Sequence, residues 1–205
     1  MWYVIQTETG REQELVAAIG RNPRMRSYER CFVILQECVW RIEGACKVYK
    51  KPLFPSYVFV ETESPEQLFL ALKQIPKMSR LLGNDGQFWA VRQEERELLC
   101  KMMGLGKGSR REEDVRCKNN SRWKENGTQE KSTDGQYFEE KYLVRRSPVR
   151  VNGEGEILEA GGFLKDYMDR IVRKRLRKRS VTIEIPFLGE KRRIQIGIRV
   201  EGEEA

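Results

Sequence analysis

The 205-residue chain contains no histidine. General acid–base catalysis would therefore depend on carboxylates, lysine, tyrosine or cysteine. The acidic residues are scattered, and none of them forms a D-x-D or H-x-E pattern that could hold a metal ion. We expect a protein that is not an enzyme and that carries no metal and no cofactor.

Cysteine is sparse, and its spacing favours neither a zinc site nor a redox pair. The cysteines are odd in number and include no C-x-x-C pair. Cys38 and Cys46 flank a predicted hairpin and could approach each other, but in a reducing cytoplasm we expect free thiols. The full set is Cys31, Cys38, Cys46, Cys100 and Cys117.

Long apolar runs are also missing. No segment approaches the length that crosses a membrane, and the N-terminus lacks the basic and apolar regions of a secretory signal. Positive charge is in excess, with a net charge of +8 and a pI near 9.3. We therefore expect a soluble cytoplasmic protein, free of membrane, that binds an anionic partner.

The first segment, residues 1–103, alternates strand and helix patterns. Thr9 followed by Glu12 is a capping-box pattern, and Pro65 marks a second helix start. This order predicts an open α/β sandwich with a mostly antiparallel sheet and helices packed against it. Strands are expected over residues 2–6, 31–42, 47–53, 57–60 and 87–91, and helices over 10–21, 65–75 and 92–103.

The rest of the chain divides into a linker and a second domain. Residues 104–144 are rich in Gly, Ser, Asn, Lys and Glu and are expected to be a flexible linker. Residues 145–205 alternate apolar and polar side chains in short strands, which predicts a small SH3-like β-barrel. Pro186 is expected at an edge or bulge, because proline has no N–H to donate to a sheet.

A basic run dominates the last segment. Seven of the ten residues from Arg170 to Arg179 are basic and none is acidic. A solvated surface is one interpretation. Phosphate binding is favoured because arginine predominates, and its planar guanidinium matches phosphate oxygens. We expect RNA contacts at Arg173, Lys174, Arg175, Arg177, Lys178, Arg179, Arg192 and Arg193.

Residues 53–60, Leu-Phe-Pro-Ser-Tyr-Val-Phe-Val, turn at Pro55-Ser56 into a strand with apolar side chains on both faces. Such a strand must be covered on both faces, and helices of the same domain usually cover one, which leaves the other for a partner. Together with the opening Met1-Trp2-Tyr3-Val4-Ile5-Gln6, this segment resembles the N-terminal domain of the NusG family of transcription elongation factors, with Ser56 in place of the usual Gly.

A second resemblance lies in the barrel segment. Val151-Asn152-Gly153-Glu154, Gly161-Gly162-Phe163-Leu164-Lys165-Asp166 and Ile171-Val172 look like the KOW motif that closes NusG-family proteins, although the family usually has Gly-Pro where Gly161-Gly162 stands. The resemblance thus covers residues 1–103 and about 147–200. It implies a monomer with an N-terminal NusG-type domain, a linker and a KOW barrel.

The resemblance also implies partners. NusG-type domains grip two coiled helices of the RNA polymerase clamp with an aromatic patch, which carries over to Trp2, Tyr3, Phe54 and Tyr57 as candidate contacts. The alternative interpretation of these side chains is sheet core. The expected partners are RNA polymerase and nascent RNA, with non-template DNA, the Rho terminator or a ribosomal protein as further alternatives.

Within the family, the strongly basic barrel looks closest to specialised paralogues of the LoaP type, which are processive antiterminators. In that type the KOW domain is associated with an RNA hairpin in the nascent leader. Two alternatives remain open. One is a housekeeping NusG that couples polymerase to Rho or the ribosome, and the other is a KOW-type ribosomal or RNA-processing protein.

Overall fold

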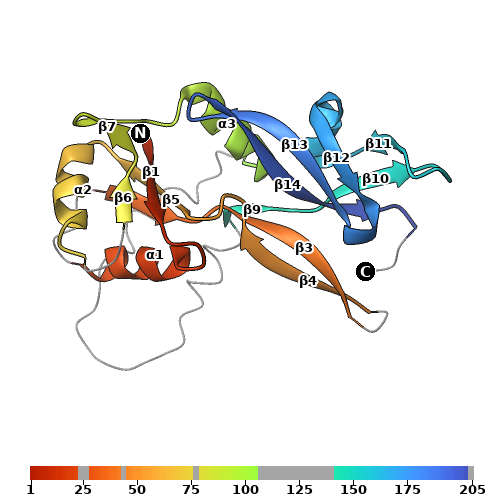
Figure 1. Ribbon diagram of the computed structural model, residues 1–205, viewed down its shortest axis with the longest axis horizontal. Coiled ribbons are helices and arrows are strands. Elements are labelled where there is room, and N and C mark those ends of the chain that lie inside the picture. The colour runs from red at the N-terminus through yellow and green to blue at the C-terminus, as the bar shows by residue number, and fades with distance from the viewer. Residues whose placement is uncertain (23–27, 43–44, 76–78, 106–140, 203–205) are drawn as a thin grey trace.

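The computed structural model describes residues 1–22, 28–42, 45–75, 79–105 and 141–202 of the chain. Its elements form two parts that lie side by side along the long axis (Figure 1). We call the elements from β1 to β9 the N-terminal part, and the strands β10 to β14 with two short 3₁₀ helices the C-terminal barrel. Most of the linker expected over residues 104–144 lies outside the described residues.

The N-terminal part is built on a four-stranded sheet in the order β2-β5-β1-β6, antiparallel throughout. Helices α1 and α2 cover one face and bury Ile5, Val58 and Leu68 with it. Helix α3 contributes Leu99 to the core on the other face, where Val4 also points. The bounds are β1 Trp2–Thr7, α1 Glu12–Arg21, β2 Tyr28–Phe32, β5 Tyr57–Thr62, α2 Pro65–Leu72, β6 Ser79–Leu81 and α3 Gln93–Met102; a small ribbon follows β6, made of β7 Gly83–Asn84 and β8 Gln87–Phe88.

The capping box predicted at Thr9 does not form. Helix α1 begins at Glu12, and the residue before it, Arg11, makes no side-chain capping bond. The buried Glu12 carboxylate instead accepts hydrogen bonds from the backbone N–H groups of Gly10, at 2.9 Å, and Ser56, at 2.7 Å. Glu12 therefore fastens the helix start to the turn that precedes β5, a long-range role that local spacing does not reveal.

The single strand expected over residues 31–42 is two strands. β2 ends at Phe32 in the four-stranded sheet, and β3 (Leu35–Ile42) starts a different sheet. Between them, Ile34 accepts a bond from the Leu53 N–H at 2.8 Å, and the Leu35 N–H donates to Tyr142 at 2.8 Å. The prediction failed because residues 32–36 are buried without interruption across the change of sheet, so periodicity gives no signal there.

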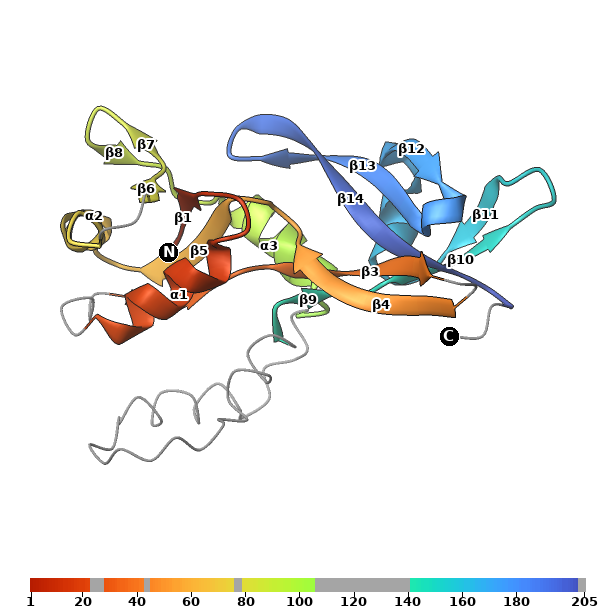
Figure 2. The ribbon, with the colours of Figure 1, turned by 60° about the horizontal axis from the view of Figure 1, so that its bottom comes forward.

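The second sheet is a hairpin with one added strand. β3 pairs antiparallel with β4 (Ala45–Pro52), and β9 (Leu143–Val144) pairs parallel to β3. β9 belongs to the last residues of the expected linker, yet its side chains are buried. The hairpin runs alongside β14 of the C-terminal barrel (Figure 2).

The C-terminal barrel is one curled five-stranded sheet in the order β11-β10-β14-β13-β12. Only the pair β10–β14 is parallel. Pro186 lies opposite Lys191 of β14, beyond the stretch where β12 pairs with β13, so its missing donor faces no strand. The bounds are β10 Ser147–Val151, β11 Ile157–Ala160, η1 Gly162–Arg170, β12 Ile171–Arg175, η2 Leu176–Lys178, β13 Ser180–Phe187 and β14 Glu190–Val200.

The predicted fold class, mixed helices and sheet followed by a small β-barrel, is confirmed. What the sequence did not indicate is that the two parts share a core. One continuous cluster of buried side chains runs from Val4 and Phe59 of the N-terminal sheet to Phe187, Ile183 and Ile196 of the barrel. The barrel therefore packs on the face of the N-terminal sheet that the helices α1 and α2 leave open.

Candidate functional site

An aromatic cluster joins the two parts, and Phe187 stands at its centre. Phe187 ends β13 and is completely buried. Its ring stacks on Phe54, with centroids 4.6 Å apart and planes at 25°, and it lies 6.4 Å from Tyr57 and 6.0 Å from Phe59. Such pairs add about 0.5–1.5 kcal/mol each to the gain from burying their surface. The barrel thus fills the aromatic face of β5.

All four expected polymerase contacts are buried in this arrangement. Phe54 and Tyr57 lie under Phe187, with 5% and 8% of their surface exposed. Trp2 packs edge-on against Phe32 at 5.1 Å in the same core. Tyr3 points to the opposite face, into the core under α1 and α2. The structure therefore brings Phe54 and Tyr57 together at the contact between the parts, and separates Tyr3 from them.

The turn before β5 is held in an uncommon conformation. Ser56 has φ +72°, a left-handed value that is usual for glycine and infrequent for other residues. Three contacts hold it there: its N–H bonds to Glu12, its carbonyl accepts from the Thr7 N–H at 2.8 Å, and its hydroxyl lies 2.6 Å from that of Thr9. These bonds position the start of β5, and with it Tyr57.

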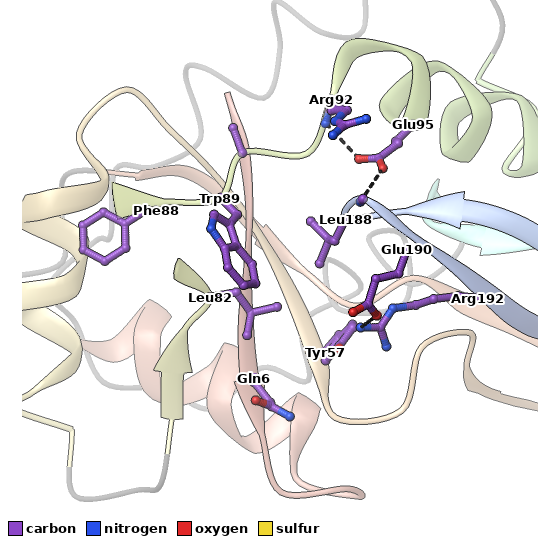
Figure 3. A pocket seen from close by; sticks show the side chains of 12 residues that line it. Gln6, Tyr57, Leu82, Phe88, Trp89, Arg92, Glu95, Leu188, Glu190 and Arg192 are labelled. Atoms are coloured by element: carbon purple, nitrogen blue, oxygen red, sulfur yellow. Dashed lines mark hydrogen bonds and ion pairs between the residues drawn. The ribbon is translucent and has the colours of Figure 1, made fainter. Parts of the chain in front are cut away.

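A pocket of about 620 Å³ opens beside the aromatic contact. Figure 3 shows Trp89 and Tyr57 on the side of the N-terminal part, and Leu188 and Arg192 on the side of the β13–β14 hairpin. The Arg192 guanidinium lies 5.3 Å from the centre of the Tyr57 ring, a cation–π distance. This pocket marks where the hairpin tip meets the sheet edge.

Polar contacts fasten the tip of the β13–β14 hairpin to helix α3. Glu95 accepts a bond from the Arg92 N–H at 3.0 Å, which caps the helix start. Its other oxygen accepts a bond from the Gly189 N–H at 3.4 Å (Figure 3).

On the exposed side of the same helix, Lys101 pairs with Asp166, and this hydrogen bond lowers the pKa of Asp166 and raises that of Lys101.

A second contact joins hairpin β3–β4 to the barrel. Glu37 accepts a bond from the Arg146 N–H at 3.1 Å and lies 3.8 Å from its guanidinium nitrogen. Gly197 of β14 approaches the hairpin so closely that a Cβ there would lie 2.2 Å from the Glu37 carbonyl oxygen. Glycine is the only residue that fits this approach without movement of one part against the other.

The basic run forms an exposed edge of the barrel. Arg173 and Lys174 lie on the edge strand β12, and Arg177 and Lys178 on the turn η2 that follows. All four are exposed, and within the described ranges no carboxylate forms an ion pair with any of them. The run borders a shallow hollow of about 430 Å³ lined by Arg173, Arg175, Leu176, Arg177 and Lys178.

Three of the expected RNA-contacting arginines are already bonded to groups of the same chain. Arg179 has a left-handed backbone and donates from its side chain to the Leu176 carbonyl. Arg192 pairs with Glu190 at 3.4 Å, and Arg193 pairs with Glu184 at 3.6 Å. These side chains are engaged within the chain, whereas Arg173 and Lys178 form no ion pair with a carboxylate of the described residues.

The two cysteines of hairpin β3–β4 lie apart, and three thiols of the described residues resist ionisation. Cys38 is opposite Tyr49 and Cys46 is opposite Arg41, so the two cysteines point to opposite faces of the hairpin and remain free, as expected. Desolvation raises the pKa of Cys31 to about 12 and raises that of Cys38 and Cys100. These buried thiols are therefore neutral at physiological pH.

Sequence reasoning missed the residues that join the two parts. Phe187, Glu95 and Gly197 make that contact. In the sequence they are interpreted locally, as a strand end, a helix cap and a glycine within a strand, so their long-range role is not apparent. It also missed the exposed pair Trp40 and Tyr49 on hairpin β3–β4. The available signal was an aromatic residue next to lysines in a strand with few other apolar groups.

Two kinds of feature are absent from the described residues. No group of three or more Asp, Glu, Cys or His side chains gathers there in a way that could hold a metal ion. None of the helices found in those residues is both long and apolar enough to cross a membrane.

Comparisons with known proteins agree with the N-terminal resemblance. Residues 1–100 match the family model described as "Transcription termination factor nusG". Two curated relatives, each the "Transcription termination/antitermination protein NusG" of a strain of Helicobacter pylori, are 27% identical over 89 residues. The aligned region covers 41% of this chain and 51% of each relative, so the chain spans about half the length of the curated relatives it matches.

A solved structure, "Domain interaction in Thermotoga maritima NusG", is also similar, with a TM-score of 0.46 and 14% identity over 96% of this chain and 93% of that chain. The similarity to the family rests on the sequence match, and the solved structure adds no argument to it. The match over residues 1–100 shows that the N-terminal part of this chain is similar to the NusG family.

Proposed function

We propose that this chain is a transcription factor of the NusG family that acts as a processive antiterminator, close to the LoaP type. The N-terminal part binds the clamp helices of RNA polymerase, and the basic run of the barrel binds a hairpin in the nascent RNA. The family match over residues 1–100 and the names of the curated relatives support the first half of this proposal. The exposed basic run supports the second.

The polymerase-binding surface in this proposal is the aromatic face that the barrel covers. Phe54 and Tyr57 are buried under Phe187, so a helical partner reaches them only after the tip of the β13–β14 hairpin withdraws. Uncovered aromatic side chains make strong anchors for a helix, because they bury much surface at low cost in conformational entropy. Trp2, buried in the same core, and Tyr3, buried on the opposite face, support the sheet that carries Tyr57.

The observation that carries the RNA half is the contrast among the basic side chains. Arg192 and Arg193 are paired with acids of the barrel, whereas Arg173, Lys174, Arg177 and Lys178 have no such partner among the described residues. Exposed cations without acids nearby release bound counterions when they meet phosphates, which makes binding strong and dependent on salt. Because A-form RNA hides its base edges in a deep groove, selectivity would depend on a loop or bulge.

Charge reversal tests the RNA half. In transcription through a terminator that follows the cognate leader, R175E/R177E should abolish readthrough while binding to polymerase remains. The double variant R21E/K165E, which changes net charge equally at exposed sites outside the run, is the matched control. Normal readthrough by R175E/R177E would mean that the run is a solvated surface, and would favour a housekeeping NusG coupled to Rho or the ribosome.

A pull-down of RNA polymerase tests the other half. The full chain should retain polymerase, and Y57A should weaken that binding by about 2 kcal/mol, as loss of a central interface aromatic commonly does. Binding of structured RNA without any binding of polymerase would identify the chain as a KOW-type ribosomal or RNA-processing protein.

A further inference from the structure

Hairpin β3–β4 exposes two aromatic rings far from the core. Trp40 has 63% of its surface exposed and Tyr49 has 40%. Their ring centroids lie 6.3 Å apart, with the planes inclined at 59°. Burying rings of this size is strongly favourable, so their exposure on a projecting hairpin indicates a surface that meets a ligand.

The register of the hairpin sets which side chains share this face. Residues directly opposite each other in an antiparallel pair point to the same side. Trp40 is opposite Lys47, Cys38 is opposite Tyr49, and Gln36 is opposite Lys51. The two rings therefore lie on one face, with a lysine at either end.

The charge of this face is positive. Lys47 and Lys51 of strand β4 lie on it, and the strand contains no acidic residue. The one acid of strand β3, Glu37, lies on the opposite face of the hairpin and is paired with Arg146. A ligand that approaches the rings thus meets lysines without a competing carboxylate from either strand.

The same face leads to the basic run of the barrel. Lys51 donates a hydrogen bond to Gln195 of β14 at 3.3 Å. Across the barrel sheet, Gln195 is paired with Thr182, and Thr182 with Arg173. Neighbouring strands are spaced about 4.8 Å apart, so Arg173 lies roughly 10 Å from Gln195. The hairpin face is therefore linked to the basic run across the outer face of the barrel sheet.

We propose that Trp40 and Tyr49 stack unpaired bases of single-stranded RNA that flanks a structured RNA held by the basic run. This inference rests on the proposed RNA binding of the barrel and adds a second subsite to it. Aromatic rings interleaved with cations are the usual platform for single strands, because rings stack on bases while lysines contact phosphates. A protein partner fits less well, since a stable protein interface needs about 800 Å² on each side, far more than two rings supply.

The test measures binding of the full chain to two RNAs by fluorescence anisotropy. One is a hairpin with an unpaired flank of several nucleotides, and the other is the same hairpin with a blunt end. W40A and Y49A should each weaken binding of the flanked RNA by about 5- to 100-fold, the range expected for one lost stacked base. Binding of the blunt RNA, and the salt dependence of both, should not change.

Three controls make the result specific. W40F retains a ring and should recover most of the affinity for the flanked RNA. L70A removes an exposed apolar side chain from α2, on the opposite part of the molecule, and should bind both RNAs like the unaltered chain. Because Trp40 is exposed, W40A should also keep the melting temperature of the parent, which excludes unfolding as a cause.

The two proposals fail in different ways. If R175E/R177E binds neither RNA while W40A and Y49A bind both normally, the proposed stacking of bases on Trp40 and Tyr49 is wrong. The proposed RNA binding by the basic run is then retained. The hairpin face would then serve a protein. If the unaltered chain binds neither RNA, the proposed RNA function is wrong and the platform falls with it.

Discussion

The aromatic face of the N-terminal sheet and the basic edge of the barrel are both expected binding surfaces, yet the structure treats them in opposite ways. Phe54 and Tyr57 are buried against Phe187 of the same chain. Arg173 and Lys174 are exposed on an edge strand without a partnering acid among the described residues. One surface is occupied from within, and the other is open.

The difference has a physical reason. An apolar face loses free energy whenever it meets water, so any available apolar surface of the same chain covers it when no partner is present. A cationic edge loses nothing in water, and burying its charges would be costly. Apolar binding surfaces therefore invite coverage from within the chain, whereas charged ones remain accessible.

Removal of the Phe187 ring, which covers the aromatic face, should have the largest effect. F187A deletes a completely buried aromatic side chain, and such changes cost about 3–5 kcal/mol of stability. Urea unfolding should show a lower midpoint, and the parent should unfold in one transition because its two parts share a core. F187L, which keeps an apolar side chain, should lose less. Equal stability of F187A and the parent would show that the parts do not share a core in solution.

A substitution at Gly197 should weaken the contact between the two parts by a smaller amount. In G197A the new Cβ would lie 2.2 Å from the Glu37 carbonyl oxygen, so the two parts must separate locally at a cost of about 1–3 kcal/mol. We expect faster amide exchange in β3 and tighter binding of a polymerase clamp fragment, because less energy is then needed to uncover Tyr57.

The matched control for that change is G153A. No atom lies within 4 Å of a Cβ at Gly153, which is in the barrel on a turn away from the contact. G153A should bind the clamp fragment like the parent. If G197A also binds it no better than the parent, coverage by the barrel does not limit access to the aromatic face.

Alkaline pH probes the other face of the N-terminal sheet, which α1 and α2 cover and against which Cys31 packs. The pKa of Cys31 is about 12 in the folded chain, above the ordinary value of 9.0. The contribution of Cys31 to the free energy of unfolding is fully present below pH 9 and is lost as pH rises toward 12. Over this range the unfolded chain releases a proton that the folded chain retains. The slope is about 1.4 kcal/mol per pH unit. The free energy of unfolding of C31A should therefore fall less steeply from pH 9 to 11 than that of the parent.

Thiol labelling supplies the counterpart on the exposed side. Cys46 is exposed on hairpin β3–β4 and should react quickly with iodoacetamide at neutral pH. Cys31 and Cys38, whose thiols have raised pKa values, should react only when the chain unfolds. Rapid labelling of Cys31 in the folded chain would contradict the closed core around β2.

The smallest expected effect comes from removing a single charge from the exposed basic edge of the barrel. R173Q should weaken RNA binding severalfold and lower the slope of log affinity against log salt by about 0.9, the change expected for one lost phosphate contact with a duplex. R193Q, which removes a guanidinium already paired with Glu184, should change that slope much less. Equal slopes for R173Q and the parent would remove Arg173 from the RNA surface.

Much of the secondary structure could be predicted from local patterns. The helix that starts at Pro65, the strands around Val181 and Ile194, and the edge position of Pro186 follow from periodicity and from what proline permits. The break between Phe32 and Leu35 could not, because residues 32–36 are all buried and give no alternation that marks it. The role of Glu12 was misread for a related reason, since its partner Ser56 is distant in sequence.

The sequence by itself determined the fold class, the family resemblance of the N-terminal part and the presence of a basic edge, since these depend on residue type, spacing and charge. Only the tertiary structure decided that Phe187 covers Phe54 and Tyr57, that Arg192 and Arg193 are engaged, and that Trp40 and Tyr49 are exposed. An apolar or charged side chain specifies the kind of neighbour it favours. Which neighbour it meets depends on the tertiary structure, and for Phe187 the neighbours Phe54 and Tyr57 are more than a hundred residues away in the sequence.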